Sequence, residues 1–66
     1  MAEVVIRYKG GRDWERNREI IRISADYNYQ GVGSGGDFCI MVGEEGLEEF
    51  CKKLRKLGYV ESVKLK

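Results

Sequence analysis

The side chains able to carry out acid–base or nucleophilic chemistry are few in this chain and are not grouped. Histidine, the commonest general base and metal ligand, is absent. Ser24, Ser34 and Ser62 have no evident basic partner, and two cysteines alone make a poor zinc site. Cys39 and Cys51 both have the character of small core or patch residues, for which nothing in the sequence indicates a stabilised thiolate. We therefore expect a protein that is not an enzyme, with no catalytic residues, no metal and no cofactor.

The glycine-rich run 31–36 has the composition of a phosphate-binding loop. Such loops lie between a strand and the amino end of a helix and often carry a lysine. This run joins two predicted strands and has no lysine, so a plain hairpin loop is favoured. The other glycine-bearing joint, residues 43–46, does precede a predicted helix, but Glu44 and Glu45 would repel an anion. No small-molecule substrate is evident.

Length and composition indicate a single domain over residues 1–66. Of the 66 residues, 42% are hydrophobic and 35% are charged, which is ordinary for a globular protein. A chain of this size buries only about 60% of its unfolded surface, near the lower limit for an unaided core. There is no apolar run near 20 residues, and the start lacks the regions of a signal peptide. We expect a cytoplasmic location and no membrane partner.

One helix is predicted together with both of its ends, between Gly43 and Tyr59. Glutamates fill its first turns and lysines and arginines fill its last, which complements the helix dipole. Gly58 is expected to end it in the left-handed conformation. The apolar positions follow the i, i+3, i+4, i+7 spacing of one buried stripe: Leu47, Phe50, Cys51, Leu54 and Leu57.

Four segments are predicted to be strands: residues 3–9, 19–29, 37–43 and 60–66. Residues 19–29 alternate with a period of two, which favours a strand, whereas residues 12–18 fit a loop, a strand extension or a short helical turn. The predicted class is α+β with the order β-β-β-α-β, a four-stranded mixed sheet with one helix packed on one face. The alternative places a helix at residues 13–22 and gives the ferredoxin-like order β-α-β-β-α-β.

Alternation assigns the strand side chains to two faces, and a single helix covers only one of them. The other face, here called the outer sheet face, is predicted to be exposed and basic, with apolar residues among the bases and Val60 on its last strand. Cys39 lies on this face and Cys51 on the helix, so we expect two free thiols. The candidate binding residues are those of the outer sheet face and the neighbouring tryptophan: Val5, Arg7, Lys9, Trp14, Ile20, Arg22, Met41 and Lys64.

Exposed apolar patches usually mark a contact with another protein, so this face predicts a protein partner or a homodimer. The alternative is a nucleic-acid-binding protein, for example a DNA-binding one, that contacts phosphates through the same face. Trp14 stands among Arg12, Arg16 and Arg18, a mixture suited to stacking on bases and gripping phosphates, although a loop tryptophan more often covers one edge of a small core. Sequence analysis therefore predicts a small binding module.

Overall fold

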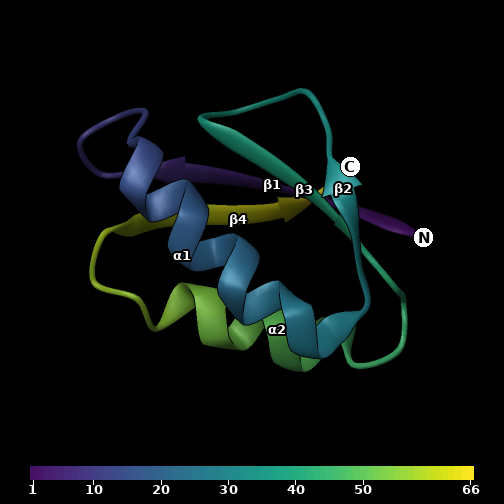
Figure 1. The fold of residues 1–66 in the computed structure, drawn as a ribbon. Helices are drawn as coiled ribbons and strands as arrows, with labels where there is room; N and C mark the ends of the chain where they lie inside the picture. The colour runs from purple at the N-terminus through teal and green to yellow at the C-terminus, as the bar shows by residue number, and fades with distance from the viewer.

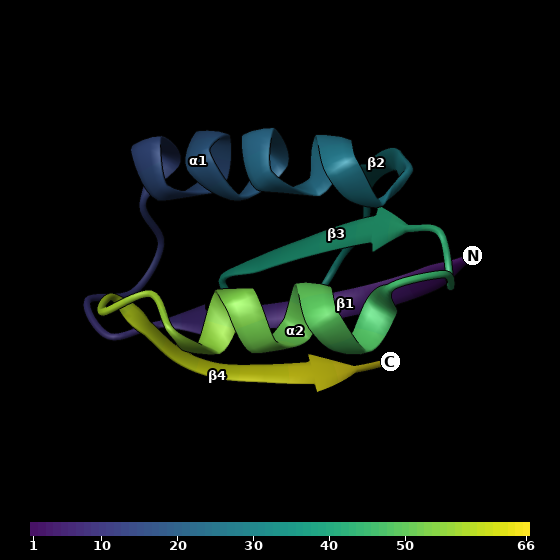
Figure 2. The same ribbon diagram turned by 90° about the horizontal axis from the view of Figure 1, so that it is seen from below.

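The computed structural model describes residues 1–66 as one four-stranded sheet and two helices. The elements are β1 (Ala2–Tyr8), α1 (Trp14–Ser24) with a 3₁₀ turn (Ala25–Tyr27), β2 (Tyr29–Val32), β3 (Phe38–Val42), α2 (Leu47–Arg55) and β4 (Val60–Leu65). The strand order is β2-β3-β1-β4, and every neighbouring pair is antiparallel. Both helices lie on the same side of the sheet, as Figures 1 and 2 show from two directions.

The α+β class and the helix packed on one face of a four-stranded sheet are confirmed. The element order, however, is that of the ferredoxin-like alternative, and the strand expected over residues 19–29 is wrong. Most of that segment lies in α1 and the 3₁₀ turn, and only its end belongs to β2. With a helix in this place, the fourth strand returns antiparallel to β1, so the sheet is antiparallel throughout and not the mixed sheet expected from the sequence.

α1 forms because residues 19–29 fit the helical period as well as the period of two. Asp13 caps the helix, since its carboxylate accepts the backbone N–H groups of Glu15 and Arg16 at 3.0 and 3.2 Å. Glutamate and arginine, both good helix formers, occupy most of its exposed positions. The helical i, i+3, i+4, i+7 spacing is found at Ile20, Ile23, Ser24 and Tyr27.

The core lies between the helices and the sheet. Ile20 of α1 and Phe50 and Leu54 of α2 are fully buried there. The only buried polar side chain, Ser24, donates a 2.6 Å hydrogen bond to the carbonyl of Ile21. Most strand residues that the sequence assigns to the helix side are buried or half-buried in the structure: Val4, Ile6, Tyr8, Phe38, Ile40 and Val42. Leu65 lies opposite Val4 near the end of β4 and is the exception, since it is 58% exposed.

A bulge in the pairing of β1 with β4 overturns the expectation for Val60. Arg7 lies opposite Ser62, but Tyr8 lies opposite Val60, so Glu61 is an extra residue in β4. The extra residue turns Val60 to the same side as Val63, and both are 7% exposed in the core. Val60 therefore does not belong to the outer sheet face.

α2 is confirmed, but its special glycine lies at the other end from the one expected. Gly46, which precedes the helix, has a φ of 77°, whereas Gly58 is not among the residues with positive φ. A Cβ at Gly46 would stand 3.2 Å from the ring of Tyr27, so glycine there allows both the turn and the close contact. Gly46 thereby brings α2 against the 3₁₀ turn.

Candidate functional site

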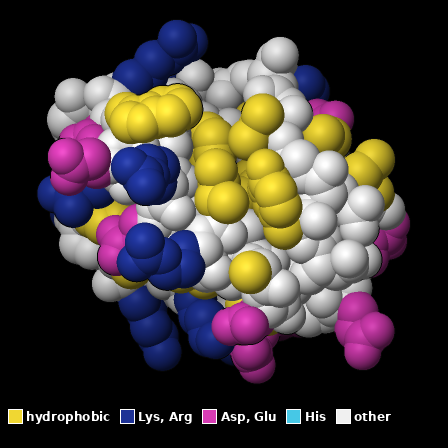
Figure 3. All heavy atoms as spheres, viewed as in Figure 1, with side chains coloured by type: hydrophobic (Ala, Val, Ile, Leu, Met, Phe, Trp, Pro, Cys, Tyr) yellow, Lys and Arg dark blue, Asp and Glu magenta, His cyan; other side chains and the backbone are white.

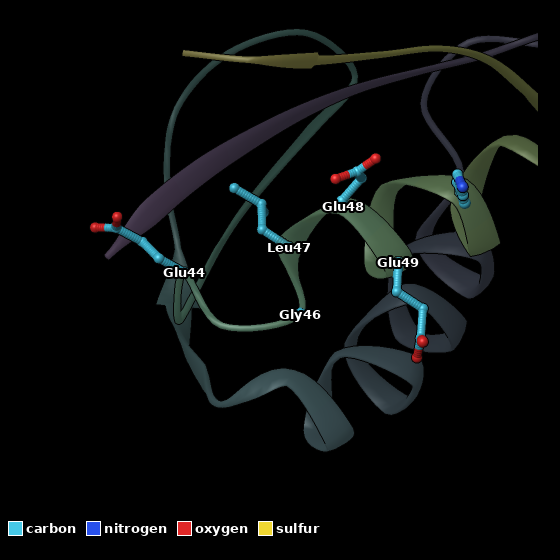
Figure 4. Close-up of a pocket in the computed structure, with 6 residues that line it drawn as sticks. Glu44, Gly46, Leu47, Glu48 and Glu49 are labelled. Carbon is cyan, nitrogen blue, oxygen red and sulfur yellow. The ribbon is translucent and has the colours of Figure 1, made fainter.

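The largest depression of the surface, about 570 Å³, lies at the start of α2 and has little capacity for chemistry. Leu47 is its only hydrophobic lining residue. Figure 4 shows its carboxylates pointing in different directions rather than toward one point. Glu44 binds the N-terminal amine at 2.9 Å, and Glu49 accepts a 2.6 Å hydrogen bond from the hydroxyl of Tyr27. The structure contains no group of three or more histidine, cysteine or acidic side chains able to hold a metal ion.

Both thiols are free and buried, and the expectation of two free cysteines on opposite sides of the sheet is confirmed. Cys51 faces the core from α2, whereas Cys39 lies on the outer sheet face, opposite Val5. Burial raises the pKa of both thiols, and the nearby Glu3 carboxylate raises that of Cys39 further. Neither cysteine is therefore placed to act as a nucleophile.

Four of the eight predicted binding residues come together on the outer sheet face. Val5 and Arg7 project from β1, Met41 from β3 and Lys64 from β4, where Lys64 lies directly opposite Val5. Arg7 and Lys64 are exposed, while Val5 and Met41 are half-buried. At these four positions the outer sheet face mixes bases with apolar residues.

The loop between β2 and β3 covers part of this face. The segment Gly33–Gly36, here called the glycine loop, passes so close that a Cβ at Gly33 would stand 3.1 Å from the sulfur of Cys39. The backbone N–H of Gly33 also donates to the carbonyl of Cys39 at 2.9 Å. As a result Cys39 is only 1% exposed although no helix covers it. The hairpin expected here is confirmed, but its position over the sheet is not apparent from the sequence.

The other four predicted binding residues lie elsewhere. Ile20 is fully buried in the core and cannot bind anything, because α1 turns it toward the sheet. Arg22 is exposed on α1, which lies on the opposite side of the sheet from the outer face. Lys9 follows the end of β1 in a turn, and Trp14 is the first residue of α1. The predicted surface therefore divides between two sides of the molecule.

A second apolar surface, which was not predicted from the sequence, lies between α1 and the free edge of the sheet. Tyr29 and Val32 of β2 lie opposite Val42 and Ile40, which places them on the helix side of the sheet. They are 39% and 53% exposed, and Trp14 is 74% exposed.

One side of α1 faces this edge. Arg16 stacks over the Tyr59 ring at 4.3 Å and Glu19 accepts the Tyr59 hydroxyl, so that side of the helix faces the segment after α2. Trp14 and Ile21, one heptad apart, lie on the other side. Figure 3 shows hydrophobic side chains gathered here, between α1 and the β2–β3 edge, with lysine and arginine side chains over α1 beside them. We call the following residues the α1–β2 surface: Trp14, Ile21, Tyr29, Val32 and Phe38.

One feature of the sequence, a long run without charged residues, marks this surface. Residues 27–36 are ten consecutive residues without a charge, the longest such stretch in the chain. The run includes β2, which pairs with β3 on one side only. An uncharged segment that becomes an edge strand is uncommon, because charges usually protect such edges.

Comparisons with protein-family models, with curated proteins and with solved structures give no match to this chain. Neither helix of the structure has the length and apolar character needed to cross a membrane.

Proposed function

We propose that this chain is a non-enzymatic binding module that recognises a protein partner, or a second copy of itself, through the α1–β2 surface. The observation that carries the proposal is the exposure of Trp14, Tyr29 and Val32 on one side of the molecule. Exposed apolar side chains gathered beside a free sheet edge are typical of a contact that another chain covers.

The outer sheet face supports such a contact less well. Its apolar members Val5 and Met41 are half-buried, and the glycine loop already covers part of it. The nucleic-acid alternative remains a prediction of the sequence, and the basic residues predicted for it are divided between two sides of the molecule. Arg7 and Lys64 lie on the outer face, whereas Arg22 is exposed on α1.

The tryptophan provides the test, because Trp14 is the only one in the chain and lies within the proposed surface. Peptides selected from a random display library are titrated into the protein while Trp14 emission is recorded. We expect binding to shift the emission to shorter wavelength and to weaken at least about tenfold in Val32→Glu, which would bury an unpaired charge. The matched control is Lys64→Glu, an exposed change on the outer face, which should leave binding intact.

Two outcomes contradict the proposal. Peptides that bind Val32→Glu with the affinity of the wild type, but fail to bind Lys64→Glu, would place the site on the outer face. Tight binding of a short DNA duplex that falls steeply with added salt, with no effect of Val32→Glu, would favour the nucleic-acid alternative.

A further inference from the structure

The two edges of the sheet are protected very differently. β4 carries Glu61 and Lys64, and the side chain of Arg55 donates to the carbonyl of Val63 at 3.4 Å. Charges along an edge strand discourage pairing with another chain. β2, at the opposite edge, has no charged residue and lies within the uncharged run 27–36. β2, a four-residue strand with one bulge, therefore lacks the charges that would discourage pairing with another chain.

The register of β2 makes this edge complementary to itself. A bulge at Gln30 brings Tyr29 and Val32 to the same face of the sheet, since they lie opposite Val42 and Ile40. Without the bulge, two residues three positions apart would point to opposite faces. If two such strands run antiparallel with their centres between Gln30 and Gly31, each Tyr29 lies opposite the Val32 of the other copy.

We propose that β2 pairs with β2 of a second copy in this register, around a two-fold axis, and joins the two sheets into one continuous sheet. The inference rests on the proposed function, because it names a second copy as the partner of the α1–β2 surface. The pairing forms two cross-strand contacts between an aromatic and a β-branched side chain, a favourable combination in antiparallel sheets. It covers Tyr29 and Val32, which are otherwise exposed.

The register of β2 matches its own copy, and the charge of the strand does not oppose such a pairing. A closed two-fold contact uses the same patch on both partners, so a patch with a net charge along the pairing line would repel itself. β2 has no charge to repel its copy. The side of α1 that carries Trp14 and Ile21 lies on the same side of the sheet as Tyr29, so it adds apolar area on each side of the strand pair.

The test is a register-specific cross-link. Y29C and V32C variants are purified separately under reducing conditions, mixed in equal amounts and oxidised. We expect a disulfide-linked dimer in the mixture and little in either variant alone, because position 29 faces position 32 of the other copy and not itself. The natural thiols interfere little, since Cys39 and Cys51 are both buried. Sedimentation of the wild type should show a monomer–dimer equilibrium that depends weakly on salt.

The outcomes separate this inference from the proposed function. A wild type that stays monomeric at millimolar concentration overturns the β2 pairing, while selected peptides that lose affinity for Val32→Glu would still support the proposed function. A dimer whose mixed variants do not cross-link, or cross-link no better than each variant alone, also overturns the pairing. The pairing is supported if Val32→Glu raises the dissociation constant of the dimer by at least about tenfold while Lys64→Glu leaves that constant unchanged.

Discussion

The glycine loop offers a sharp test of the structure, through the substitution Gly36→Ala. Gly36 has a φ of +56°, and an added Cβ would stand 2.7 Å from a methyl group of Val5 and 2.8 Å from the carbonyl oxygen of Ile6. Ordinary carbon contacts lie at about 3.5–4.0 Å. The Val5 side chain is able to rotate away, but the Ile6 carbonyl belongs to β1 in the middle of the sheet. That carbonyl also accepts the backbone N–H of Asp37 at 2.9 Å.

The expected loss of stability follows from three contributions. A left-handed alanine costs about 1–2 kcal/mol. Weakening the hydrogen bond to Ile6 costs about 1 kcal/mol. The lower entropy of the unfolded alanine chain returns about 0.4–1 kcal/mol. We therefore expect Gly36→Ala to lower the free energy of unfolding by about 1–3 kcal/mol, out of about 3–10 kcal/mol for a domain of this size.

Denaturant titration measures this loss, and native-state reaction with an aromatic disulfide reagent measures its local consequence. Lifting the glycine loop should expose Cys39 and accelerate its reaction, whereas Cys51 in the core should remain slow. Gly10→Ala is the matched control, because nothing lies within 4 Å of its Cβ position and its φ is not positive. If Gly36→Ala matched this control in stability and left Cys39 as unreactive as in wild type, the loop would not lie over the sheet as described.

Three further predictions concern the core, the cap of α1 and the phenols of Tyr8 and Tyr59. Leu54→Ala should lower the free energy of unfolding by about 2–5 kcal/mol in denaturant titration, because the side chain is fully buried. A loss below about 1 kcal/mol would mean that the face of α2 carrying Leu54 does not pack against the sheet. Asp13→Ala should lower the free energy of unfolding by about 0.5–2 kcal/mol, because it removes the N-cap of α1. Asp26→Ala, at an exposed position, is the control, and equal stability of the two variants would argue against the cap. Burial raises the pKa of Tyr8 and Tyr59, so stability should be full below about pH 10, the ordinary tyrosine pKa, and should fall as the pH rises above it. Tyr8→Phe should reduce that alkaline loss in a pH series of thermal melts, and an unchanged slope would contradict it.

Local patterns were sufficient to predict α2 and the strands β1, β3 and β4. The helical spacing of Phe50, Cys51 and Leu54, with acids before and bases after, allows only one structure. β1 and β3 are likewise predicted with the correct face inward, because Val4, Ile6 and their partners alternate over a short run. The composition and the absence of histidine predict a binding protein rather than an enzyme.

Residues 13–27 show where local patterns are insufficient. Isoleucines at positions 20, 21 and 23 satisfy a period of two and a helical period together, so periodicity does not decide between them. The choice depends on the Asp13 cap and on the burial of Ile20 against the sheet, which is a contact between segments far apart in the chain.

The candidate site itself was decided by tertiary structure. One extra residue in β4 turned Val60 inward, and the glycine loop returned across the sheet to bury Cys39. The exposed apolar surface instead formed where Trp14 of α1 and Val32 of β2 lie on the same side of the sheet. Burial is a property of the packed layers rather than of any short segment, so the sequence determined which side chains were available and the fold determined which of them remain exposed.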